Sequence, residues 1–374
     1  MKKILIIVLI AVAFVIGALY LTYLLMCEDD WCYHYEWQKE RRTDSYDSSS
    51  ASAIEGNEQI EEQGESLCPP VFNFEFTDFS KIDAFQPIGS IGGASPGRSY
   101  ITIKQGETVP VYAPMDATLK AVVYAYRGPQ ADHGEYGLKF DTKCGITFFL
   151  DHLDSVSEEM NKYAPAEPAR STAVNDILSI PVKAGTLLGY TDGTSQARTF
   201  DFLATDSTKK AFHINPDRWV WEQSLYSICP YDLYEGELKE KYYQKIGISR
   251  ESGFEKAENC GNISYDIENT ISGGWFKDDA ATDRKGEFML IGERDGIVDL
   301  AVKRESEAAI LRVSDSASEE SPKDIGIGES VCYEEPGNGW AYVKLVDSET
   351  IELASGSGSC PSSFPASNSK TYYR

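Results

Sequence analysis

The sequence predicts a mainly β protein in which one N-terminal transmembrane helix precedes two blocks of short strands. The prediction rests on an uncharged N-terminal run, on β-branched runs separated by Gly, Pro and Asp, and on the length. After the run and a linker, the 374 residues leave room for about two domains. We expect the first block to form a β barrel or sandwich and the second to form a small antiparallel β barrel.

Residues 4–26 contain no charged side chain. As an α-helix they would be about 35 Å long, slightly more than the roughly 30 Å hydrocarbon core of a bilayer. Lys2 and Lys3 precede the run and acidic residues follow it, so the positive-inside rule predicts a cytoplasmic N-terminus. Residues 1–27 are therefore expected to anchor the chain in the cell membrane by a single pass, with the bulk extracytoplasmic. A cleaved secretory signal is the alternative.

Residues 28–67 are expected to be an acidic, Ser-rich linker, because they contain too few large apolar side chains to form a core. The whole chain carries 35 Lys and Arg against 59 Asp and Glu, a formal net charge of −24. Such a charge repels phosphate, and no basic stripe reverses it locally. Nucleic acid is therefore excluded as an expected partner.

The first predicted domain covers residues 68–250 and combines strands with two closing helices. The helices are expected at residues 216–227 and 235–245, where apolar positions recur at helical spacing. The expected strands are short runs bounded by turn residues, at 100–104, 108–112, 118–126, 137–141, 146–151, 186–190 and 198–204.

The second predicted domain covers residues 258–374 and consists of strands at the spacing of an antiparallel meander. The segment GGWF at residues 273–276 is interpreted as a turn followed by two core aromatic residues. The expected strands are 263–267, 286–291, 296–302, 308–313, 330–334, 340–346 and 350–354.

Eight cysteines without any CxxC spacing favour disulfide bonds over metal binding in an exported chain. We expect Cys332 and Cys360 to pair within the last domain. Eight cysteines allow 105 complete pairings, so the sequence leaves the other pairs open.

Four segments of the first β block resemble, in order and spacing, the lysostaphin-like zinc metallopeptidases, whose barrel is called a duplicated hybrid motif. They are VYAPMDATL at 111–119, FFLDHLDSV at 148–156, VKAGTLLGYTDGT at 182–194 and TFDFLATD at 199–206. The resemblance covers about residues 95–206. It implies a peptidase-like barrel with a substrate groove and a zinc site.

The family's site residues carry over only in part. His152 matches a catalytic histidine of the family. At the family's H-x-H-F motif, Thr199 replaces a catalytic histidine and Asp201 replaces a metal ligand. Counting back without gaps places Arg98 and Thr102 at the other two ligand positions, and a permanent cation at residue 98 opposes a metal. The resemblance thus implies that Arg98, Thr102, Thr199 and Asp201 line a binding groove.

No cofactor is therefore expected, and the hypothesis is a degenerate peptidase-like domain that is not an enzyme. It would bind cell-wall glycan-peptide, that is peptidoglycan, or regulate a cell-wall hydrolase. The alternative is an active zinc-dependent cell-wall endopeptidase with a rearranged site that includes Asp201 and His152, with His133 and Asp151 as further candidates. A third possibility is that the barrel is only a spacer on a surface protein.

Overall fold

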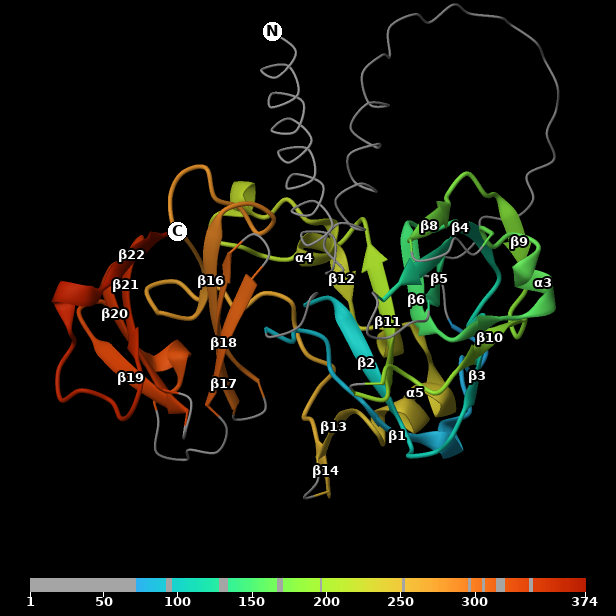
Figure 1. The fold of residues 1–374 in the computed structure, drawn as a ribbon, viewed down its shortest axis with the longest axis horizontal. Helices are drawn as coiled ribbons and strands as arrows, with labels where there is room; N and C mark the ends of the chain where they lie inside the picture. The colour runs from blue at the N-terminus through green and yellow to red at the C-terminus, as the bar shows by residue number, and fades with distance from the viewer. Residues whose placement is uncertain are drawn as a thin grey trace, which may run out of the picture. The chain divides into compact units, whose positions relative to one another are not determined.

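Antiparallel β-sheet dominates the described part of the chain, for which the coordinates are a computed structural model (Figure 1). The structure describes residues 72–374, except for 92–95, 128–133, 167–170, 196, 251–252, 295–296, 305–306, 314–319 and 336–338. The predicted membrane anchor and the whole of the predicted linker lie outside the described residues.

The predicted fold class is wrong in its closure, although the chain is mainly β. The described strands form open sheets, including a half-barrel, in place of the barrel and the second small barrel. No helix among the described residues is long and apolar enough to cross a membrane. Alternating apolar patterns predict that strands exist, but they do not determine whether the two edges of a sheet meet.

The largest sheet carries the first β block and has the strand order β1-β2-β11-β6-β5-β4-β8. Two further strands, β12 and β9, pair with β11 and β4. The bounds are β1 Ile82–Phe85, β2 Arg98–Ile103, β4 Ala117–Tyr126, β5 Gly134–Asp141, β6 Ile146–Leu153, β8 Ala173–Asn175, β9 Ile180–Val182, β11 Thr199–Asp206 and β12 Ser227–Ile228.

Two smaller sheets accompany the large one. A three-stranded sheet has the order β3-β10-β7, with β3 Val109–Tyr112, β10 Leu187–Thr191 and β7 Ser155–Val156. A hairpin joins β13 Gly247–Arg250 to β14 Gly253–Lys256. The predicted strands of this block are therefore present, and they are shared between the large and the three-stranded sheets.

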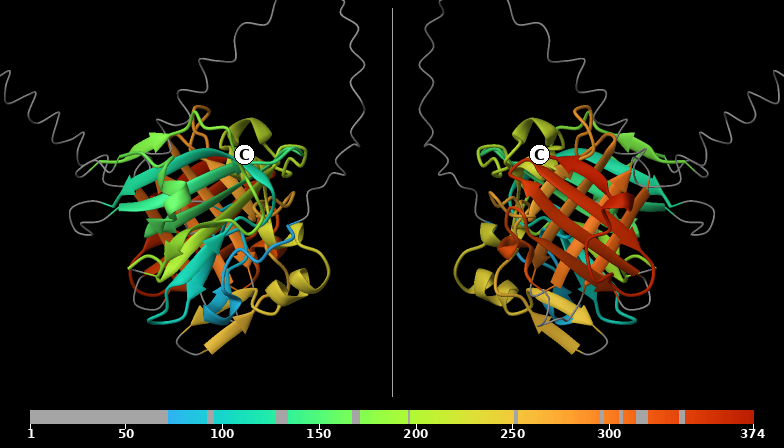
Figure 2. Two further views of the ribbon diagram at one scale, coloured as in Figure 1. Left: turned by 90° about the vertical axis from the view of Figure 1, so that its right-hand side faces the viewer. Right: turned by 90° about the vertical axis from the view of Figure 1, so that its left-hand side faces the viewer.

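The second β block, orange to red in Figure 2, is an eight-stranded antiparallel sheet. Its first strand in the chain, β15, pairs with its last, β22. Its order is β18-β17-β16-β15-β22-β21-β20-β19. GGWF is strand β15 and not a turn, while the predicted strand at 263–267 is absent. The bounds are β15 Gly273–Phe276, β16 Glu287–Arg294, β17 Ile297–Arg304, β18 Glu307–Val313, β19 Ser330–Glu335, β20 Gly339–Asp347, β21 Thr350–Gly356 and β22 Lys370–Tyr373.

The helices are shorter than the sequence predicts. Instead of one helix over 216–227, a 3-10 turn Pro216–Arg218 is followed by the separate helix α4 Glu222–Tyr226. The second predicted helix is α5, Gly236–Tyr243. The remaining short helical elements are α3 Glu158–Asn161 and the 3-10 turns Phe79–Lys81, Pro230–Leu233, Pro322–Asp324 and Ala366–Asn368.

Buried aromatic side chains hold α5 and the turn at Pro230–Leu233 against the large sheet. Tyr231 and Tyr242 stack with ring centroids 5.5 Å apart, and Phe76 stacks on Tyr242 at the same distance. The Tyr231 hydroxyl is 2.7 Å from the hydroxyl of Ser99 on β2. This hydrogen bond satisfies two polar groups that burial would otherwise penalise.

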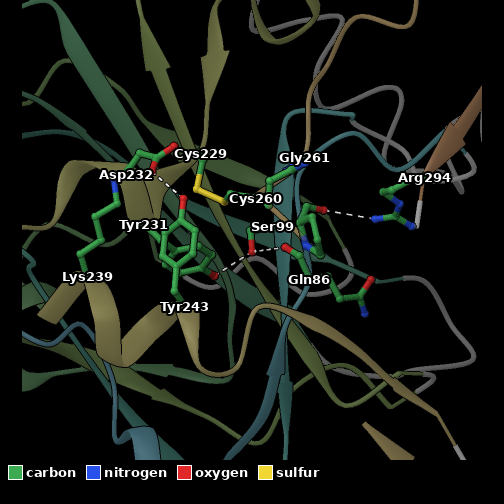
Figure 3. Close-up of a disulfide and its surroundings, with 12 residues drawn as sticks. Gln86, Ser99, Cys229, Tyr231, Asp232, Lys239, Tyr243, Cys260, Gly261 and Arg294 are labelled. Atoms are coloured by element: carbon green, nitrogen blue, oxygen red, sulfur yellow. Dashed lines mark hydrogen bonds and ion pairs between the residues drawn. A yellow bond between two sulfur atoms is a disulfide. The ribbon is translucent and has the colours of Figure 1, made fainter. Parts of the chain in front are cut away.

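A disulfide bond between Cys229 and Cys260 lies beside this aromatic cluster (Figure 3). A second disulfide joins Cys332 to Cys360, the pair that the sequence favours. Cys144 is also disulfide-bonded. Cys229 and Cys260 are buried, whereas Cys144, Cys332 and Cys360 are partly buried.

The loop before α4 packs onto the second β block through Trp219. Its ring stacks on His213 with centroids 4.1 Å apart and contacts Phe276 edge-on. A side chain at Gly274 would collide with this ring, since an added Cβ would lie 2.3 Å from it. The Asp283 carboxylate also accepts a 2.9 Å hydrogen bond from the backbone amide of Val220. These contacts fix the loop that follows β11.

Arg374 stabilises β15, the first strand of the second block. Its guanidinium lies over the ring of the fully buried Trp275, 4.1 Å from the ring centroid. It also donates hydrogen bonds to the backbone carbonyls of Ile267 and Ser272. Gly273, two residues before Trp275, has φ +127°, a conformation that disfavours any side chain.

We predict that Arg374→Ala destabilises the chain by about 2 to 3 kcal/mol, because it removes a cation–π contact and leaves two carbonyls without their donor. Urea denaturation followed by tryptophan fluorescence measures the change. Lys370→Ala on the same strand is the matched control, since its ion pair with Glu287 is long and exposed. An Arg374→Ala effect no larger than that of the control would contradict the prediction.

Candidate functional site

Three neighbouring strands bring the candidate site together in the middle of the large sheet. Strand β11 lies between β6 and β2, and Asp201 on β11 is directly opposite Asp151 on β6. On the other side of β11, Leu203 is opposite Arg98 at the start of β2. This register therefore brings together Arg98, Asp151 and Asp201, which are far apart in the sequence.

Arg98 bridges the two aspartates. Its Nη1 donates hydrogen bonds to Oδ2 of Asp151 at 2.9 Å and to Oδ2 of Asp201 at 2.7 Å. All three residues are at most 7% exposed. A buried carboxylate is costly unless it is paired, and here one guanidinium serves both.

The ring of His152 lies between the carboxylates of Glu135 and Asp201. Its Nδ1 is 2.6 Å from Oε2 of Glu135 on β5, and its Nε2 is 3.3 Å from Oδ2 of Asp201. Both ring nitrogens therefore face carboxylates. The ring extends the charged cluster to a fourth strand, so that β2, β11, β6 and β5 each contribute to it.

The backbone of His152 has φ +65°, which is unusual for a residue other than glycine. Two hydrogen bonds hold it there. Its amide donates to Oδ1 of Asp151 at 3.0 Å, and its carbonyl accepts from the Thr191 hydroxyl at 2.7 Å. Gly137 opposite leaves the room for Asp151, because an added Cβ would lie 2.8 Å from Oδ1. Such strained positions persist where the surroundings over-determine them.

The carboxylates also control the protonation of the histidine. Burial lowers the pKa of His152, but the nearby Asp201, Asp151 and Glu135 carboxylates outweigh burial and raise it to about 10. Burial likewise lowers the pKa of Arg98, but the two aspartates outweigh burial and raise this pKa. At neutral pH the cluster thus holds two cations, and the histidine is an imidazolium.

The four residues predicted to line a groove share one face of β2 and β11. Thr102 and Thr199 are opposite each other in the ladder, and Arg98 and Asp201 lie further along it. All four are buried, with exposures of 7% or less.

The remaining sequence candidates are only partly brought together. Asp151, His152 and Asp201 each place a ligand-capable atom within 4.8 Å of the others. His133 lies outside the described residues. His213 takes no part, because its Nε2 is 2.9 Å from the carbonyl of Ser224 and its ring stacks on Trp219.

Sequence analysis missed Glu135. No spacing rule links it to His152, and its position follows only from the pairing of β5 with β6, which contains an irregularity between Tyr136 and Leu138. A single acidic residue in a chain with 59 acidic residues carries no signal of its own.

Zinc does not fit the residues present. A catalytic zinc site needs three protein ligands and an open fourth position. Both aspartate oxygens that point into the cluster are bound to Arg98, whose guanidinium remains charged at any ordinary pH. A divalent ion placed among these side chains would be repelled by this cation and by the imidazolium of His152.

Comparison of the chain with protein-family models, curated proteins and solved structures gives no match.

We predict that stability falls as pH rises from 7 to 9, because the raised pKa of His152 stabilises the fold below pH 6.5 and this contribution is lost on approach to pH 10. One linked proton gives a slope of about 1.4 kcal/mol per pH unit. Urea denaturation at several pH values measures it. Starting at pH 7 avoids Asp154, whose pKa burial and Asp192 raise to about 6.

The control for this measurement is His152→Gln, which keeps a polar side chain but cannot be protonated. Its pH dependence over the same range should be flatter by about 1.4 kcal/mol per pH unit. Equal slopes for the variant and the unaltered chain would show that His152 is not protonated in the folded state.

Proposed function

We propose that the chain is a non-catalytic binding or scaffolding protein, in which a buried salt-bridge network stands where a peptidase would hold its metal. The single observation that carries this proposal is the guanidinium of Arg98, whose Nη1 lies 2.9 Å from Asp151 and 2.7 Å from Asp201. The resemblance to lysostaphin-like peptidases supplies the comparison, since it assigns residues 98 and 201 to ligand positions.

The state of His152 supports the absence of catalysis. A general base must accept a proton near neutral pH, and its reactive nitrogen must reach the group that it deprotonates. The His152 ring faces Glu135 on one side and Asp201 on the other, and its pKa is raised to about 10. An imidazolium held in this way is a structural cation and a poor base.

The disulfides support a location outside the cytoplasm. Cys229–Cys260 and Cys332–Cys360 lie in different parts of the chain, and disulfides persist mainly in oxidising compartments. Within this proposal the ligand is cell-wall glycan-peptide or a hydrolase that acts on it, the ligand class that the resemblance favours. The resemblance assigns Arg98, Thr102, Thr199 and Asp201 to the floor of the proposed binding groove.

The proposal predicts that the purified full-length chain contains far less than one zinc per molecule and does not cleave peptidoglycan, yet co-sediments with peptidoglycan sacculi. Elemental analysis and a sedimentation assay test these points, with the chain alone and an unrelated acidic protein as controls. Stoichiometric zinc, together with peptidoglycan cleavage that His152→Ala abolishes, would instead establish the zinc endopeptidase. Failure to sediment with either sacculi or a cell-wall hydrolase would leave the spacer hypothesis.

A further inference from the structure

We infer that Arg98 occupies a divalent-cation site. Asp151, His152 and Asp201 form the ligand set, and the guanidinium of Arg98 stands in the position of the cation. Replacing Arg98 with a neutral residue should therefore open the site to Zn²⁺ or Co²⁺. The inference rests on the proposed function insofar as the unaltered chain is taken to be free of metal.

The spacing of the three candidate ligands supports this inference. Their ligand-capable atoms all lie within 4.8 Å of one another, and Nε2 of His152 is 3.3 Å from Oδ2 of Asp201. In a tetrahedral zinc site with bonds of about 2.0 to 2.1 Å, neighbouring ligand atoms are about 3.3 to 3.4 Å apart. The histidine and one aspartate are thus already at ligand separation.

The surroundings of the histidine provide an independent observation. A metal-binding histidine almost always donates its second ring N–H to a carboxylate, a carbonyl or water, which fixes the ring. Here Nδ1 of His152 is 2.6 Å from Oε2 of Glu135, which leaves Nε2 directed at Asp201. In addition, Oδ1 of Asp201 is buried without a hydrogen-bond partner among the described residues. A metal ion would give this oxygen a partner.

The charges also match. In the unaltered chain, the carboxylates of Asp151 and Asp201 are paired with the guanidinium of Arg98. A divalent ion in its place would again set a cation against these two carboxylates. Exchanging Arg98 for a metal therefore leaves neither aspartate without a positive partner.

The experiment compares the unaltered full chain with Arg98→Ala and Arg98→Met, using Co²⁺ as a spectroscopic probe and Zn²⁺ in thermal unfolding. Both variants should bind about one Co²⁺ per chain, with visible absorption typical of a four-coordinate ion. Their affinity should exceed that of the unaltered chain by on the order of a hundredfold. Zn²⁺ should raise the unfolding temperature of the variants only.

Three further variants separate this site from adventitious binding. Arg98→Lys retains a cation and should bind no more Co²⁺ than the unaltered chain. Arg98→Ala combined with His152→Ala should lose the absorption. Arg98→Ala combined with Glu135→Gln should bind about 10 to 100 times more weakly than Arg98→Ala, because the histidine loses its orienting carboxylate.

The inference is overturned if neither neutral variant binds more Co²⁺ than the unaltered chain, or if removing His152 leaves the absorption unchanged. If the neutral variants fold only when Co²⁺ is supplied during expression, the recovery of folded, cobalt-bound chain supports it; failure to recover such chain overturns it. Stoichiometric zinc in the unaltered chain would contradict the proposed function instead. The two failures are therefore distinguishable.

Discussion

The ion pairs of Arg98 with Asp151 and Asp201 constrain the register of the central sheet. Buried carboxylates are stabilised only while their partners are in place, so the guanidinium ties β2, β11 and β6 to one register. A one-residue slip of β11 would turn Asp201 to the opposite face and leave a buried cation without one of its partners. His152 and Glu135 extend the same constraint to β5, so four adjacent strands are aligned by one cluster of charges.

This cluster also explains two local features that would otherwise only destabilise the fold. The positive φ of His152 directs its ring between Glu135 and Asp201, and Gly137 on the neighbouring strand leaves space for the Asp151 carboxylate. The strained backbone of His152 and the lack of a side chain at Gly137 both serve the same set of ion pairs. These ion pairs therefore compensate for the strain. Hydrophobic residues in place of these charged ones would relieve the strain, but they would not determine which strands are neighbours.

The sequence predicted most strands of both blocks, because alternating apolar side chains are a local signal that survives without knowledge of the fold. It did not predict that the sheets stay open, since the strand order depends on pairs that are distant in the chain, such as Phe276 with Tyr373. The short strand β15 was missed because its two glycines resemble a turn. In the site, Arg98, His152 and Asp201 were found through the resemblance, whereas Glu135 was not. The contacts of Arg98 cross 53 and 103 residues of sequence, distances over which only the fold brings groups together.

As proposed, Arg98 takes the place of a metal ion, and this changes what can disturb the cluster. Metal affinity depends on supply and on competing protons at the ligands, whereas Arg98 is covalently attached and stays protonated. The cluster then has an alkaline limit, where His152 loses its proton. Below that limit, the ion pairs of Arg98 hold β2, β11 and β6 in register. The proposed binding function would depend on this fixed geometry, and it would give up the reactivity that a metal supplies.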